Sequence, residues 1–189
     1  MTRRAPFIVG LLLCASTATS GDVGSVRPKS LTAAEVGSRL RVFGTAGDPK
    51  LENADVTAVV RRTDGFLVDF WRNRPILPTT SQLGTLTDVD AIWQIHPIVR
   101  FGDKSAPALA QRVSTLSDGI EVEGIAELSG VRYRTRTLHR LHPREARLSM
   151  TTTFSVDGGA ASGPIEFGDE VKWGNTRYYV EGLGQPRMK

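Results

Sequence analysis

Cysteine is nearly missing from this chain of 189 residues, which has one, Cys14. A disulfide needs two cysteines, so none can form within the chain, and packing must stabilise the fold. Histidine is also scarce, and three scattered residues are too few for most metal sites. The apolar run over residues 7–15 is shorter than the roughly 20 helical residues that cross a bilayer. We therefore expect no metal, no cofactor and no transmembrane span.

The N-terminus has the order of a secretory signal. Two arginines precede the apolar run 7–15, and small residues follow it up to Ser20. We expect cleavage after Ser20, so that residues 1–20 are a signal peptide and the protein is secreted or lies in the periplasm or cell envelope. The alternative is a lipoprotein anchored through an acylated Cys14, although the large Leu13 precedes that cysteine where a small residue is favoured.

A strong excess of charge of one sign is lacking as well. The formal net charge is +4, with 24 Lys and Arg against 20 Asp and Glu. Two of the basic residues lie within residues 1–20, which contain no acid, so the expected mature chain has 22 basic and 20 acidic side chains. This weak balance gives no reason to expect nucleic acid or an anionic membrane as a partner.

Strand patterns replace the missing helical ones. The longest alternating stretch, residues 131–156, predicts an antiparallel ribbon that reverses around Pro143. Asp-Gly pairs at residues 64–65 and 118–119 lie between alternating runs and predict two further hairpins. Pro97, in the middle of an apolar stretch, predicts an edge strand or a bulge.

Many short strands with Gly and Pro turns predict an all-β fold, an antiparallel β-sandwich. Only residues 31–37 have a brief helical pattern. After the signal peptide we expect a flexible lead-in over residues 21–37 and one β-sandwich domain over residues 38–189.

One face of the predicted ribbon carries Arg132, Arg134 and Arg136. Arginines two residues apart on a strand can bind phosphate, sulfate or carboxylate groups bidentately. The alternative, which we favour, is a solvated face whose arginines pair with acids of the preceding strand. Those acids are Glu121, Glu123 and Glu127.

Three tryptophans complete the set of candidate binding residues: Trp71, Trp93 and Trp173. An indole can stack on the apolar face of a sugar ring, but tryptophans at strand ends more commonly fill a core. We favour the core interpretation for them.

Recognisable catalytic chemistry is not found in the sequence. It has no G-x-S-x-G elbow, no P-loop and no dinucleotide fingerprint. Asp88 and Asp90 could join His96 in a small metal site, but aspartates in such a segment more commonly cap turns. We therefore predict no catalytic and no metal-ligating residues.

Three segments carry a resemblance to known families. Residues 138–148 followed by Thr-Thr-Thr-Phe resemble a hairpin of galactose-mutarotase-like β-supersandwich domains. Residues 167–175, with Gly-Asp and Trp-Gly pairs, resemble part of the N-terminal β-domain of secreted CehA/McbA-like metallohydrolases. Glu52-Asn53 before the valine-rich run 56–60 is similar to the opening of that domain.

This resemblance implies a supersandwich-like accessory domain that contacts carbohydrate and precedes a metal-dependent phosphoesterase domain of the polymerase-and-histidinol-phosphatase (PHP) type. The H-x-H motifs of that catalytic domain do not occur here, so the resemblance implies an accessory module, either stand-alone or truncated. We expect a secreted, non-catalytic domain with a glycan as its partner. The alternatives are a mutarotase-like sugar epimerase, in which His96, His142 and Glu166 would act on the sugar, and a structural protein of the cell envelope.

Overall fold

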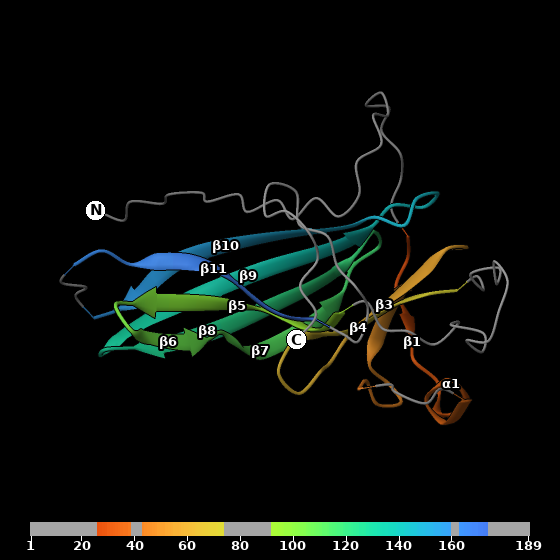
Figure 1. Ribbon diagram of the computed structural model, residues 1–189, viewed down its shortest axis with the longest axis horizontal. Helices are drawn as coiled ribbons and strands as arrows, with labels where there is room; N and C mark the ends of the chain where they lie inside the picture. Colours follow the sequence, from red (N-terminus) through yellow and green to blue (C-terminus); the bar gives the residue numbers. More distant parts are fainter. Residues whose placement is uncertain (1–25, 39–42, 74–91, 160–162, 174–189) are drawn as a thin grey trace, which may run out of the picture.

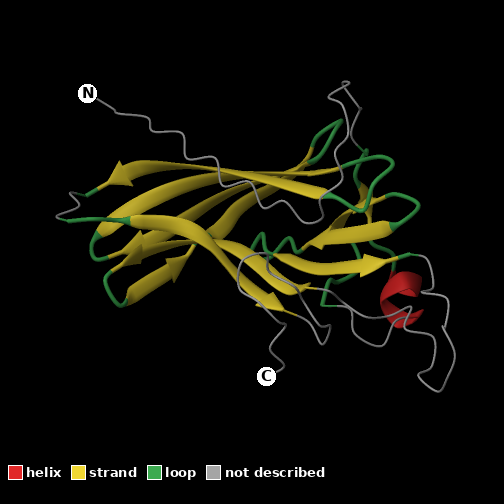
Figure 2. Ribbon diagram, turned by 45° about the horizontal axis from the view of Figure 1, so that its top comes forward, coloured by secondary structure: helices red, strands yellow, loops and turns green. Residues whose placement is uncertain are grey.

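The computed structural model describes residues 26–38, 43–73, 92–159 and 163–173. In these ranges the chain is an antiparallel β-sandwich with one short helix (Figures 1 and 2), which confirms the predicted fold class. The elements in chain order are β1 (Lys29–Ser30), α1 (Ala33–Ser38), β2 (Pro49–Glu52), β3 (Val56–Val60), β4 (Leu67–Arg72), β5 (Ile92–Phe101), β6 (Lys104–Pro107), β7 (Leu109–Thr115), β8 (Ile120–Leu128), β9 (Val131–Leu141), β10 (Leu148–Gly158) and β11 (Glu166–Trp173).

Two sheets make up the sandwich. Sheet A has the strand order β1-β2-β3-β4-β5-β11, with β6 also paired to β5, and sheet B has the order β10-β9-β8-β7. The predicted ribbon is the β9–β10 hairpin, whose register runs from Leu148 opposite Leu141 to Val156 opposite Tyr133. The two predicted Asp-Gly hairpins join β3 to β4 and β7 to β8.

Two tight turns, between β8 and β9 and between β3 and β4, depend on residues with a positive φ. Ser129 and Gly130 join β8 to β9 with φ angles of 52° and 77°, the positive values that a primed two-residue turn requires. Gly65, in the β3–β4 turn, has a φ of 77°, and a Cβ there would lie 2.4 Å from Cγ1 of Val122 in sheet B. Only glycine combines that backbone conformation with so close an approach of the sheets.

The prediction for Pro97 is wrong, because β5 is an interior strand that is continuous through it. Along one side β5 pairs with β11 on both sides of this position, and Asp169 lies opposite Pro97. Along the other side β4 pairs with Ile92 and Ile95, and β6 begins to pair at Ile98. Pro97 therefore lies between the part of β5 that pairs with β4 and the part that pairs with β6. Proline has no N–H to donate, so it fits at such a break in the hydrogen-bond ladder.

The facing sides of the two sheets form the core in two clusters. One cluster includes Ile95, Phe70, Ile120 and Met150, and the other includes Val99, Tyr133, Phe154 and Val131. Sheet B alternates strictly along β9, where odd-numbered residues are buried and even-numbered residues face outward. This alternation is the one that the sequence predicts for the ribbon.

The outer side of sheet A is covered as well, since every residue of β3 is buried. A third cluster there contains Leu31, Val59, Phe66, Val68 and Trp71, with Val36 of α1 packed against it. These residues bury the second face of the sheet, which explains why β3 is apolar at every position except Thr57.

A reciprocal capping arrangement begins α1. The backbone N–H of Thr32 donates to Glu35 Oε2 at 2.9 Å, and the backbone N–H of Glu35 donates to Thr32 Oγ1 at 3.3 Å. Residues 21–37, for which we expect a flexible lead-in, thus include β1 and most of α1.

Several predictions fall on residues outside the described ranges: the signal peptide with Cys14, the aspartates at 88 and 90, and the C-terminal residues from 174 onward. In the part of the chain that the structure describes, no helix is long and apolar enough to span a membrane.

Candidate functional site

The outward-facing side of sheet B carries the predicted arginines. Arg132, Arg134 and Arg136 alternate with buried residues along β9, and their side chains are 50%, 62% and 66% exposed. All three lie on one face, as the sequence predicts, because side chains two apart in a strand point the same way.

Acidic side chains on the neighbouring strands pair with each of these arginines. Arg132 lies 3.7 Å from Glu127, and Arg136 contacts Glu121, whose carboxylate is almost fully buried. Arg134 instead donates to Asp157 Oδ1 at 3.0 Å. The paired-face interpretation is therefore correct for two glutamates, whereas Arg134 takes its acid from the β10 side.

A bulge accounts for that difference. The β9–β10 register shifts between Val156 and Gly158, so Asp157 has no partner residue in β9. Its carboxylate reaches Arg134 and also lies 3.7 Å from Arg132. Bulges redirect side chains in this way, and the residue alternation alone does not reveal them.

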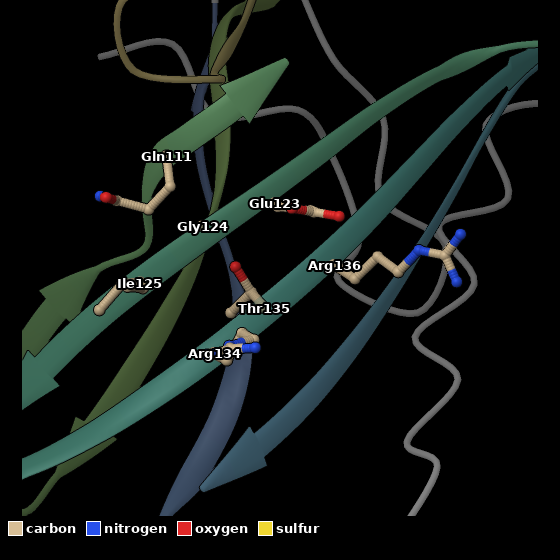
Figure 3. A pocket seen from close by; sticks show the side chains of 7 residues that line it. All are labelled: Gln111, Glu123, Gly124, Ile125, Arg134, Thr135 and Arg136. Carbon is tan, nitrogen blue, oxygen red and sulfur yellow. The ribbon is translucent and has the colours of Figure 1, made fainter. Parts of the chain in front are cut away.

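A shallow groove of about 340 Å³ opens on this face across β7, β8 and β9 (Figure 3). Two of the predicted binding residues, Arg134 and Arg136, line it. The remaining lining residues are Gln111, Glu123, Gly124, Ile125 and Thr135.

A bulge in β7 shapes the rim of the groove. Gly124 lies opposite Thr135 in the register, and a Cβ at Gly124 would meet Thr135 Oγ1 at 2.8 Å and the carbonyl oxygen of Leu109 at 3.1 Å. Beside it, the β7–β8 register shifts between Ala110 and Arg112, so that Gln111 is the additional residue of a bulge. Gly124 faces the core side of sheet B, as its partner Thr135 does, so its missing side chain does not open the outer face. The bulge in β7 is the feature that places Gln111 on the rim of the groove.

The groove offers alternating hydrogen-bond donors and acceptors. Arg134 and Arg136 donate, Glu123 accepts, and the amide of Gln111 does both, while Ile125 gives an apolar patch. Glu123 also lies 3.7 Å from Arg112, so opposite charges are interspersed around the groove. Asp157 and Glu121 pair with Arg134 and Arg136, and with them the acids around the groove equal the arginines in number, which disfavours a highly anionic polymer as the ligand.

The predicted tryptophans do not join this groove. Trp71 is 3% exposed and packs in the outer cluster of sheet A, which agrees with the core interpretation. Trp93 is half-buried in β5, with its ring centroid 6.0 Å from that of Phe43. The side chain of Trp173, the last residue of β11, lies outside the described part of the structure.

The residues named for an epimerase lie at separate places. His96 is buried in β5, stacked on Phe66 at 4.2 Å between ring centroids, and accepts a hydrogen bond from Gln94. Burial lowers its pKa, although Glu170 opposes this effect. Glu166 lies opposite Arg100, four residues along β5, which is roughly 13 Å at 3.3 Å per residue.

His142 lies in the β9–β10 loop, beyond the last residue of β9. Its imidazole is 3.6 Å from Glu145, and its carbonyl oxygen accepts a hydrogen bond from Asn53. In the described ranges no group of three or more His, Cys, Asp and Glu side chains could hold a metal ion.

Sequence reasoning finds the two arginines of the groove and names Glu123 as an acid of the same face, but it misses the other lining residues. Gln111 reaches the groove through a bulge, which depends on how β7 aligns with β8. The glycine in the strand pattern 120–128 is the signal that could have shown a close approach there. Comparison of the chain with protein-family models, with curated proteins and with solved structures gave no match in any of the three.

Proposed function

We propose that this chain is a non-catalytic β-sandwich domain, secreted or held in the cell envelope, that binds a neutral carbohydrate in the groove of sheet B. The observation that carries the proposal is the groove itself: Gln111, Glu123, Arg134 and Arg136 present polar groups around one hollow. The resemblance to the N-terminal domains of CehA/McbA-like metallohydrolases supports an accessory role.

Sugar hydroxyls both donate and accept hydrogen bonds, so they suit a site that mixes guanidinium, carboxylate and amide groups. Each guanidinium has five N–H donors. The contact of Arg134 with Asp157 uses part of this capacity, and its side chain remains 62% exposed. The apolar Ile125 can cover the C–H face of a sugar ring.

The size of the groove limits the ligand. A volume of about 340 Å³ is near the lower end of the roughly 300–1,000 Å³ of small-molecule sites. We therefore expect a short stretch of a glycan to bind, with weak affinity, because the groove is open and lies on a sheet face.

A glycan array followed by isothermal titration calorimetry with the best neutral oligosaccharide tests the proposal. We expect Gln111→Ala and Arg134→Ala each to weaken binding about tenfold, since each removes hydrogen bonds worth roughly 1–2 kcal/mol. Arg140→Ala is the matched control, because Arg140 is exposed on the same strand and pairs with Asp118.

Two results would contradict the proposal. One is an array on which no glycan binds the folded protein. The other is a glycan that binds equally well to the Gln111 and Arg134 variants, because that ligand would use a different surface.

A further inference from the structure

The long edge of sheet B is open in the described part of the structure. β10 pairs with β9 on one side, and no described strand lies beyond it on the other (Figure 1). It is eleven residues long. The unpaired N–H and C=O groups of such an edge are a template for another strand.

Most of this edge lacks the usual protective features. Residues 148–156 contain no charge and no proline, and the bulge comes only after Val156. The other edge of sheet B has a bulge and Arg112 in β7, and the β11 edge carries charges along its length. The charged residues of β11 are Glu166, Asp169, Glu170 and Lys172.

We propose that β10 pairs with β10 of a second copy of this chain, antiparallel, about a two-fold axis at Thr152. Two residues then lie opposite each other when they are equally far from Thr152 along the strand, one before it and one after it. Opposite residues match in kind, polar with polar and apolar with apolar. Thr151 would face Thr153 of the partner subunit, Ser149 would face Ser155 of the partner subunit, and Met150 would face Phe154 of the partner subunit.

The charges at the ends favour this register over one of its neighbours. Arg147 would lie opposite the partner's Asp157, once at each end of the paired strands. A shift of two residues in one direction would instead place Glu145 opposite the partner's Asp157, and like charges opposite each other destabilise a pair. A shift by one residue would mismatch the faces of the two strands.

An exposed apolar side chain supports the same register. Val156 is 54% exposed at the end of β10, although it lies on the face of the strand that carries the core residues. In the proposed pair it would lie opposite the partner's Leu148, which covers it with an apolar neighbour.

The pairing would give a continuous sheet of two four-stranded halves. The two-fold axis stands perpendicular to that sheet, so the outer face of one copy continues as the outer face of the other. The groove lies on β7, β8 and β9 and stays open in each copy. The proposed dimer therefore does not depend on the proposed carbohydrate site, and would present two such sites on one side.

Size-exclusion chromatography with light scattering on the full chain measures the state of assembly. We expect a dimer whose dissociation rises on dilution. Thr151→Lys/Thr153→Lys would place lysines opposite each other across the axis and should make the protein a monomer. Thr115→Lys is the control, because Thr115 is an exposed threonine on the opposite edge of sheet B. A monomeric wild type, or a dimer that persists in the double-lysine variant, would overturn the proposal.

Cross-linking tests the register in a Cys14→Ser background. In Ser149→Cys/Ser155→Cys the two cysteines face each other across the interface, within the reach of a disulfide, so mild oxidation should give a covalent dimer. In each single variant the cysteine and the same cysteine of the second copy lie six residues apart along the paired strands, roughly 20 Å, so no cross-link should form. Equal cross-linking of the single and double variants would contradict this register, and circular dichroism shows whether each variant is folded.

Discussion

His139 should make the stability of this protein depend on pH in a way that one substitution removes. The residue lies on the inner face of β9, between Ile120 and Met150 in the register, and is 1% exposed. Neither ring nitrogen has a well-aligned hydrogen-bond partner among the described residues. Burial lowers its pKa from 6.5 to about 4, and the backbone of Ile120 opposes this only in part.

The sign of the effect follows from where the proton binds. Because the pKa is lower in the folded state, the unfolded chain binds more protons over the range from about 6.5 down to about 4. Stability must therefore fall as the pH falls through this window. For these two pKa values the loss relative to neutral pH is about 2 kcal/mol at about pH 5 and about 3 kcal/mol below about pH 4.

Replacement by leucine tests this reasoning. His139→Leu keeps an apolar side chain of similar size between Ile120 and Met150 and removes two buried polar atoms, each of which costs about 1–3 kcal/mol when unpaired. We expect the variant to be at least as stable as the wild type near neutral pH. At about pH 5 it should be more stable by a further 2 kcal/mol or so.

Urea unfolding, followed by tryptophan fluorescence at several pH values, gives the two stability curves. The quantity of interest is their difference, because the other shifted groups occur in both proteins and cancel. Burial lowers the pKa of His96, as it does that of His139, and raises the pKa of Asp169. Desolvation raises the pKa of Glu35, but hydrogen bonds from Lys50 and Thr32 outweigh it and hold that pKa at about 2. Parallel curves for wild type and variant between about pH 7 and pH 5 would refute the argument.

Two further predictions concern packing and a loop contact. Phe154→Ala should cost about 3–5 kcal/mol in urea unfolding, because Phe154 is 8% exposed with its ring 4.6 Å from that of Phe167; a loss below about 1 kcal/mol would show that the inner face is not packed as described. Asn53→Ala should cost about 2–4 kcal/mol by the same measurement, because its amide donates to the carbonyl oxygens of His142 and Glu145 and its oxygen accepts two backbone N–H groups of the turn. Asn53→Asp keeps the acceptor but turns a carboxylate oxygen towards the two carbonyl oxygens, so its cost should be at least that of Asn53→Ala. Equal stability of all three proteins would contradict the role of this contact.

The local parts of the fold can be predicted from the sequence. A period of two over residues 131–156 specifies which side chains of the ribbon share a face, and the structure buries Tyr133 and exposes Arg134 accordingly. The Asp-Gly pairs mark hairpins because their conformational preference is a property of two adjacent residues. Such features do not depend on which distant strands become neighbours.

Features that depend on strand order could not be predicted in this way. Pro97 is compatible with an interior strand only because β4 ends and β6 begins beside it. Arg134 pairs with Asp157 through a bulge, and Gln111 reaches the groove through another. In each case the decisive fact is a register between residues far apart in the sequence, which residue types alone do not determine.

The burial of the two sheets indicates which surface is available for binding. In the described structure the middle of sheet A is covered on both sides, because its outer face carries its own apolar cluster with α1 packed against it. Among the described residues sheet B is covered on one side only, and its outer face presents charged residues that are held in pairs. Such pairs are worth little for stability, so their value lies in fixing the directions of long side chains around the groove. A broad face of ordered polar side chains is therefore found on sheet B, which is where we place the carbohydrate site.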